Sequence, residues 1–193
     1  MLALSCRHEE TDTRLNFHAQ HAALSGYEQI IIESPDTDVA VLAIAHSSLL
    51  NSRLLFLTGT NERRRYIDIR KLAANLGESL CKALVGFHAL TGCDSTSAFV
   101  GKGKAAPFKL LRSDEVFVQA LIMLGREYDL THEVFDACER FVCSLYGHKR
   151  VDVNAVRYAM FCSKATESSL LPPTQEALMQ HVPCANYQAA VWR

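Results

Sequence analysis

A short apolar run followed directly by an acidic turn constrains this chain more than any other sequence feature. The run Gln29–Glu33 carries three consecutive isoleucines, and such a β-branched stretch predicts a strand buried in a sheet. The turn Ser34-Pro35 then leads to Asp36 and Asp38, two carboxylates separated by one residue. Carboxylates at a strand end are well placed to hold a divalent cation at the edge of a sheet. A tight turn with a helix N-cap explains the same residues equally well.

The alternation of strand-like and helix-like segments predicts an α/β fold with a parallel sheet flanked by helices and a helical C-terminal half. Strands are predicted at residues 2–5, 29–33, 53–57 and 65–69, with a hairpin turn at 60–64. Helices are predicted at residues 8–25, 38–50, 70–76, 79–91, 105–111, 115–125, 131–146, 153–162 and 175–181. We therefore divide the chain into a core over residues 1–112 and a helical extension over residues 113–193.

The composition fits an intracellular globular protein. Of the 193 residues, 49% are hydrophobic, which is enough for a proper core. The seven cysteines contain no C-x-x-C pair, which indicates reduced thiols rather than a disulfide framework or a zinc site. His18 and His21 are spaced as zinc ligands can be, but no cysteine pair accompanies them. The longest apolar run, Val39–Ala45, is too short to span a bilayer, so we expect no membrane partner.

Charge is distributed unevenly along the chain. Residues 1–40 carry two basic and seven acidic side chains, a net charge of −5, whereas residues 53–112 carry eleven basic and four acidic ones, a net charge of +7. An acidic cluster beside a basic segment fits a site that holds metal cations next to a surface for phosphates. Ordinary scatter of surface charge is the alternative explanation.

Two further acidic segments could contribute carboxylate ligands to the same site as Asp36 and Asp38. Glu10 and Asp12 come at a predicted helix start, and Asp94 follows a predicted helix in the sequence Gly92-Cys93-Asp94. Taken singly, each has a structural explanation: acidic residues stabilise the first turn of a helix, and an aspartate caps a turn. Taken in order, the three segments supply the hard oxygen ligands with which two divalent cations activate water and stabilise phosphate.

The same ordered set resembles the internal region of the flap-endonuclease/5′-exonuclease (XPG-like, PIN-like) nuclease family. Glu10-Thr11-Asp12 matches the E-x-D motif that opens a helix, Asp36-Thr37-Asp38 matches a D-x-D motif at a strand end, and Gly92-Cys93-Asp94 is similar to the third acidic element. The segment from Val100 to Lys104 is similar to the family's helix–hairpin–helix turn, which we expect near residues 92–111. Similar stretches also occur in transposon-associated animal proteins.

The resemblance implies a nuclease that hydrolyses phosphodiester bonds in branched or single-strand-containing nucleic acid, with DNA favoured over RNA and a nuclear location. Mg²⁺ or Mn²⁺ would be held by the catalytic carboxylates Glu10, Asp12, Asp36, Asp38 and Asp94. Nucleic-acid phosphates would be held by Gly101, Lys102, Gly103, Lys104 and Lys109, assisted by Arg112 and by Arg63, Arg64 and Arg65. A solvated hairpin tip explains the three arginines as well as DNA contact does.

Two departures from the family pattern keep a second function open. The family carries further metal-binding aspartates on a preceding strand and on a later segment, so we expect this chain to be truncated at its N-terminus. Lys104 also stands where the family's turn has a proline. The alternative function is therefore a catalytically inactive PIN-like module that binds nucleic acid or protein.

A phosphatase of a different α/β class is a third possibility. Such enzymes use the first aspartate of a D-x-D motif after an apolar strand as a nucleophile, and Asp36-Thr37-Asp38-Val39 fits that pattern superficially. The partner motifs are not evident. The nuclease and the inactive module remain the main hypotheses.

Overall fold

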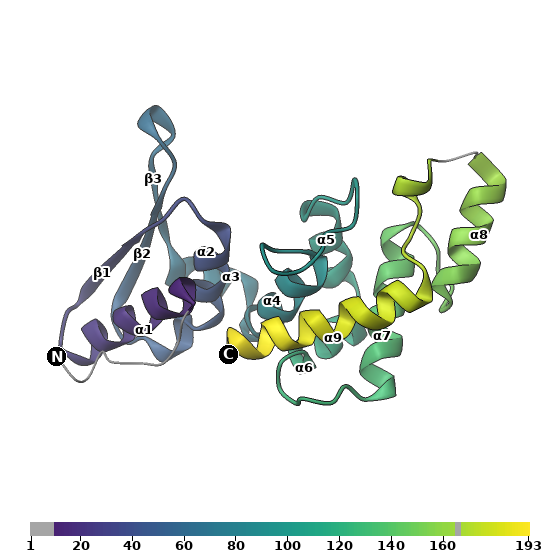
Figure 1. Cartoon of the computed structure of the whole chain (residues 1–193). Coiled ribbons are helices and arrows are strands. Elements are labelled where there is room, and N and C mark those ends of the chain that lie inside the picture. The colour runs from purple at the N-terminus through teal and green to yellow at the C-terminus, as the bar shows by residue number, and fades with distance from the viewer. Residues whose placement is uncertain (1–9, 165–166) are drawn as a thin grey trace. The chain divides into compact units, whose positions relative to one another are not determined.

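Three short strands form a mixed sheet in the N-terminal part of the chain (Figure 1). The computed structural model describes residues 10–164 and 167–193, so the strand predicted at residues 2–5 lies outside the described residues. β1 (Gln29–Glu33), β2 (Arg53–Thr58) and β3 (Arg65–Asp68) follow one another in space. β1 and β2 are parallel, as predicted, but β3 is antiparallel to β2. The prediction of a wholly parallel sheet is therefore wrong, because the short hairpin before β3 reverses the chain.

The first three helices pack with this sheet. They are α1 (Thr11–Leu24), α2 (Thr37–Ala45) and α3 (Ile69–Leu76). α1 packs against β1 and α2, and α3 packs against β2 and α2. Two short 3₁₀ turns, η2 (Ser47–Leu49) and η3 (Asn61–Arg63), complete this region. The predicted alternation of strands and helices is confirmed, and the protein is α/β with a helical majority.

One face of the sheet forms the core of this region. The parallel register pairs Ile30 with Leu54 and Ile32 with Phe56, and side chains two residues apart on a strand share a face. Ile32, Leu54 and Phe56 are buried. Ile31 points to the opposite face and is 48% exposed. The buried strand predicted from the isoleucine run is therefore covered on one side only, where Ile32 is buried and Ile30 is half-buried.

The remaining helices make up the C-terminal part of the chain. They are α4 (Glu78–Thr91), α5 (Ala105–Ser113), α6 (Glu115–Met123), α7 (His132–Leu145), α8 (Val153–Lys164), η4 (Ser168–Leu170) and α9 (Gln175–Val191). The predicted positions of these helices are confirmed, but α9 continues well beyond residue 181 and contains Pro183. The chain forms two compact units, Met1–Lys82 and Ala83–Arg193, with a boundary inside α4. The division into a core over residues 1–112 and a helical extension over residues 113–193 stays a prediction.

Aromatic side chains organise the core of the second unit. Phe141 of α7 meets Phe87 of α4 and Phe117 of α6 edge to face, with ring centroids 6.5 and 5.3 Å apart. Trp192, just beyond α9, is 3% exposed and its ring centroid lies 5.7 Å from that of His88. The C-terminal end of the long α9 helix therefore packs against α4. This packing fixes the position of α4, from which the following loop starts.

Candidate functional site

The predicted acidic turn joins β1 to α2 and forms the start of that helix. The Asp36 N–H donates to Ser34 Oγ at 3.0 Å, and the Asp38 N–H donates to Asp36 Oδ1 at 2.9 Å. Asp36 is therefore the N-cap of α2, as the structural explanation of the turn predicted. The cap uses Oδ1; Oδ2 of Asp36 has no hydrogen-bond partner within the described residues. Asp38 is buried in the first turn.

The second acidic segment opens α1, also as predicted. Glu10 precedes the helix, and Asp12 lies in its first turn. Thr13 Oγ1 donates to the backbone carbonyl of Glu10 at 3.0 Å, and Asn16 Nδ2 donates to that of Asp12 at 3.1 Å. Asp12 is half-buried, and Oε2 of Glu10 is buried. The segment therefore combines the expected helix-start charges with partly enclosed carboxylates.

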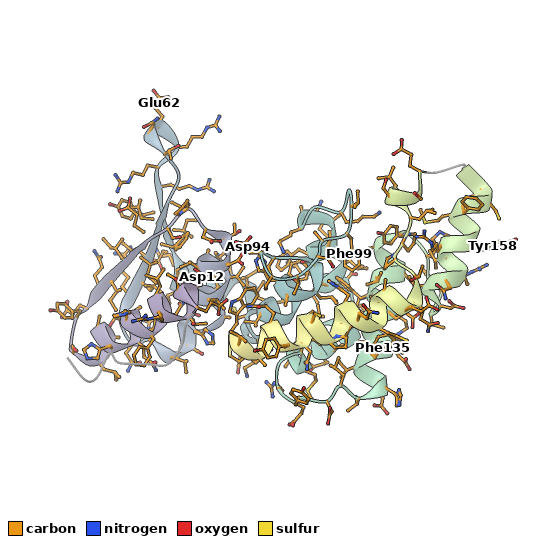
Figure 2. The ribbon with its side chains drawn as sticks, viewed as in Figure 1. Asp12, Glu62, Asp94, Phe99, Phe135 and Tyr158 are labelled. Atoms are coloured by element: carbon orange, nitrogen blue, oxygen red, sulfur yellow. The ribbon has the colours of Figure 1, made fainter. Side chains whose placement is uncertain are left out.

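The topology brings these two acidic segments to the same end of the sheet. Only residues 25–28 separate α1 from β1, so the helix runs back along the strand. The 14 residues of α1 span about 21 Å. The five residues of β1 span about 17 Å. The start of α1, where Figure 2 labels Asp12, thus lies near the end of β1, and α1 packs against α2 there.

The donor chemistry of this end of the sheet suits a hard divalent cation. Carboxylate oxygens are the ligands that Mg²⁺ and Mn²⁺ prefer. Within residues 10–164 and 167–193, however, no group of three Asp, Glu, His or Cys side chains is arranged to hold an ion. Mg²⁺ commonly takes one or two carboxylates and completes its shell with water and substrate phosphate. The residues present fit that mode of binding.

Asp94 belongs to the second unit and lies in the loop after α4. The loop is tied down by side chains: Thr96 Oγ1 donates to the Ala89 carbonyl at 2.7 Å, and Ser95 Oγ donates to Gln188 Oε1 of α9 at 2.7 Å. His181 of α9 lies between Ser97 Oγ and the Leu90 carbonyl, at 3.0 and 2.8 Å. Asp94 itself is exposed, and its carboxylate has no hydrogen-bond partner among the described residues. The prediction that the Asp94 side chain caps a turn is therefore wrong.

Gly92 sets the shape of this loop. Its φ is 105°, in the region that side-chain-bearing residues rarely adopt. A Cβ at this position would lie 2.6 Å from Cα of Ala98. The glycine of Gly92-Cys93-Asp94 is therefore required by backbone geometry, which the motif alone did not explain.

Lys104 has a structural role that the sequence did not reveal. Its ammonium group donates to the His88 carbonyl at 3.3 Å, to Thr91 Oγ1 at 3.1 Å and to the Gly92 carbonyl at 2.5 Å. A lysine carries three donors, so these acceptors match its capacity. A cation at the C-terminus of α4 also interacts favourably with the helix dipole. We therefore assign Lys104 to loop structure rather than to phosphate binding.

The rest of the predicted phosphate-binding turn is accessible. Gly101 and Gly103 are exposed, and Lys109 is exposed on α5. Lys102 is half-buried, and its ammonium lies 4.4 Å from the centroid of the Tyr146 ring, a cation–π contact. These residues keep the charge and backbone exposure that phosphate binding needs.

The hairpin tip of the first unit presents a separate basic surface. Figure 1 shows the β2–β3 hairpin projecting from the first unit, and Figure 2 labels Glu62 at its tip. Arg64 pairs with Glu33 at 2.8 Å, whereas Arg63 and Arg65 are exposed. Tyr66 follows on β3 and is 61% exposed. The tip is therefore a solvated hairpin that also has the side chains for nucleic-acid contact.

Two cysteines of α7 are buried too deeply to serve as nucleophiles. Burial raises the pKa of the Cys138 thiol to about 12 and, together with nearby Glu139 and Asp152, that of the Cys143 thiol to about 11. Both therefore stay protonated at neutral pH. This agrees with the predicted reduced, structural thiols.

Sequence reasoning missed the side chains that support the loop after α4 and those that remain exposed on α8. Gln188 is 93 residues from its partner Ser95, and no local pattern signals such a contact. Tyr158 and Phe161 of α8, a helix taken to serve packing alone, are 70% and 62% exposed. Their spacing of three residues was the available signal for a shared exposed face.

No protein-family model, curated protein or solved structure matches this chain. The resemblance to flap endonucleases therefore remains a prediction. In the described residues, no helix is both long and apolar enough to cross a membrane.

Proposed function

We propose that the chain is a divalent-metal-dependent nuclease domain acting on branched or single-strand-containing nucleic acid. The observation that supports this best is the common position of two acidic segments, Glu10–Asp12 and Asp36–Asp38, at one end of the sheet. In the proposed site, Asp36 Oδ2 and Asp12 are ligands for Mg²⁺ or Mn²⁺. When bound, such an ion activates water and neutralises charge on the phosphate.

Other residues of the chain have positioning roles in this proposal. The Ser34 hydroxyl accepts from the Asp36 N–H and fixes the Asp36 backbone, while the Asp38 N–H donates to Oδ1 and orients the carboxylate with its second oxygen. Asp94, in a loop fixed by α9, is the further acidic candidate of the second unit. Lys102 and Lys109 hold nucleic-acid phosphates.

Cleavage of a labelled 5′-flap DNA in the presence of Mg²⁺ tests the proposal. Asp36→Asn removes the charge but keeps a good N-cap, so its effect on cleavage is not an effect on folding. Asp114→Asn is the matched control, because Asp114 caps α6 with the same geometry, accepting from the Val116 N–H at 2.9 Å. We expect Asp36→Asn to lower the cleavage rate at least about 100-fold, as losing a transition-state charge contact does. Equal rates for Asp36→Asn and Asp114→Asn would reject the nuclease proposal.

A metal-independent nucleic-acid-binding module is the second candidate. It is favoured by the exposed Arg63 and Arg65 of the β2–β3 hairpin. This candidate predicts that oligonucleotide binding persists in EDTA and falls when Arg63 and Arg65 are both replaced by Ala. A strict requirement of binding for Mg²⁺ would exclude it.

A further inference from the structure

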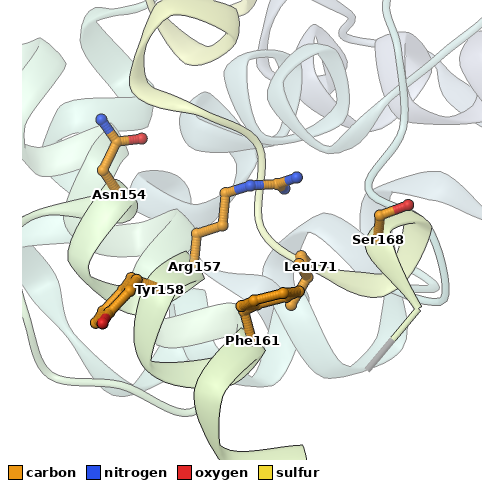
Figure 3. Close-up of a pocket in the computed structure, with 6 residues that line it drawn as sticks. All are labelled: Asn154, Arg157, Tyr158, Phe161, Ser168 and Leu171. Carbon is orange, nitrogen blue, oxygen red and sulfur yellow. The ribbon is translucent and has the colours of Figure 1, made fainter. Parts of the chain in front are cut away.

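An open pocket lies between α8 and the segment that leads from η4 into α9, in the second unit (Figure 3). Its volume is about 350 Å³, which is in the size range of small-ligand sites. It is lined by Asn154, Arg157, Tyr158, Phe161, Ser168 and Leu171. Neither the carboxylates nor the glycine turn of the proposed nuclease site contributes to it.

Two aromatic rings of this pocket are largely exposed to solvent. Tyr158 is 70% and Phe161 is 62% exposed, and their spacing of three residues puts them on the same side of α8. Figure 3 shows both rings at the pocket, with the Arg157 side chain extending between α8 and the opposite segment. Neighbouring exposed aromatic rings are atypical of an inert surface and indicate a binding face.

Polar groups of the pocket are fixed in place. The Arg157 guanidinium donates to the Pro172 carbonyl, which holds its plane in the pocket. Asn154 Oδ1 accepts from the Gln175 N–H at 2.9 Å. The Nδ2 group of Asn154 has no partner within the described residues, so its two donors are available to a ligand. A planar cation, two aromatic rings and an amide donor are the groups that recognise a nucleobase.

The pocket adjoins the predicted phosphate-binding turn. A Cβ on Gly101 would lie 3.8 Å from Cδ2 of Leu170, the last residue of η4. Lys102 contacts the Tyr146 ring at 4.4 Å from its centroid. Burial raises the pKa of Tyr146, and the charge of Arg157 opposes that rise. The approach of Gly101 to Leu170 therefore places the glycine turn next to η4, which contributes Ser168 to the pocket.

The charge of this region suits a polyanion. Residues 146–170, which include α8 and η4, contain four basic side chains and two acidic ones, Asp152 and Glu167, a net charge of +2. Asp152 is occupied as a helix cap, accepting from the Ala155 N–H at 3.0 Å. An anionic partner without aromatic groups would need only the basic surroundings, and a neutral partner only the exposed rings, whereas a nucleic acid uses both.

We infer that this pocket stacks a base of a single-stranded nucleic acid whose phosphates follow the Gly101–Gly103 turn. The inference rests on the proposed function only in requiring that the chain binds nucleic acid. It assigns substrate recognition to α8 and η4, and it gives preference to unpaired bases, because a base in a duplex cannot enter the pocket.

Fluorescence anisotropy with the full chain in EDTA tests this inference. The probes are a labelled 12-nucleotide DNA, the RNA of equal sequence, and a DNA of the same length without bases. The test variant is Tyr158→Ala/Phe161→Ala, and the matched control is Tyr128→Ala, which removes a ring that is 90% exposed elsewhere in the second unit. All the replaced side chains are exposed, so unchanged thermal unfolding is expected and serves as the folding check.

We expect the double variant to bind the better of the two normal strands at least about tenfold more weakly than wild type, and the control to bind unchanged. The strand without bases should bind wild type and double variant equally weakly. If the double variant binds the normal strands with the same affinity as wild type, this inference fails and the proposed function stands. If the variant also weakens the strand without bases by the same factor, the rings do not stack bases and the inference is again overturned. If wild type binds no strand, nucleic-acid binding itself is rejected.

Discussion

Asp36 and Lys104 both complement a helix end, but they differ in how much of their binding capacity the fold uses. Asp36 caps the start of α2 with Oδ1 alone, whereas the three donors of Lys104 meet three acceptors at the end of α4. Each charge has the sign that the helix dipole favours. The difference teaches that a structural role does not exclude a functional one. A side chain with a structural role can also bind a ligand if some of its hydrogen-bond donors or acceptors are not used within the fold.

The largest effect is expected from Gly92, because the Lys104 contacts depend on the loop shape that Gly92 sets. Gly92→Ala places a Cβ 2.6 Å from Cα of Ala98 at a φ of 105°. We expect the free energy of unfolding, measured by urea denaturation, to fall by about 3 kcal/mol. Gly103→Ala is the control, since a Cβ there meets no atom within 4 Å. Similar losses for both variants would contradict the described loop.

The second effect concerns Lys104 directly. Removing its three hydrogen bonds with Lys104→Ala should lower the free energy of unfolding by about 2 kcal/mol, because hydrogen bonds of charged groups are strong. Lys109→Ala, on the exposed face of α5, should leave stability within about 0.5 kcal/mol of wild type. Its oligonucleotide affinity should instead fall several-fold and depend less steeply on salt. If the two variants showed the reverse pattern, our assignment of Lys104 to structure would be wrong.

The smallest effect is expected from two variants of Asp36 that distinguish its role as a helix N-cap from the role of its negative charge. Asn caps a helix as well as Asp does, so Asp36→Asn should change the free energy of unfolding by less than about 0.5 kcal/mol. Asp36→Ala should cost about 1 kcal/mol, because the Asp38 N–H then loses its acceptor. Thermal or urea unfolding of both variants measures this. A loss with Asn as large as that with Ala would mean that the negative charge itself supports the fold.

Local patterns predicted the elements well and their pairing less well. The isoleucine run predicted β1 over residues 29–33, where the structure has it, since a β-branched run suits no other buried element of that length. The antiparallel direction of β3 follows from the hairpin turn that was predicted at residues 60–64, and the prediction of a parallel sheet did not take that turn into account. The length of α9 was missed: the helix predicted at residues 175–181 continues through Pro183, because burial of Val182, Ala185 and Ala189 carries it further.

The candidate site shows the same limit. The sequence predicted that Asp12 and Asp36 lie at helix starts, because motifs of that kind are local. It did not predict that Lys104 fills the end of α4, or that His181 of α9 supports the loop of Asp94, because these contacts join distant segments. Hydrogen bonds to distant segments decided the role of Lys104, and exposure decided that of Tyr158; both are properties of the folded chain.

Binding of Mn²⁺ to the full chain, followed by electron paramagnetic resonance, tests the central claim that Asp36 keeps an oxygen available for a cation. We predict saturable binding by wild type, unchanged binding by Asp114→Asn, and binding at least about tenfold weaker by Asp36→Asn, which loses a charged ligand. Identical Mn²⁺ binding by wild type and Asp36→Asn would contradict the claim and leave Asp36 as a helix cap alone.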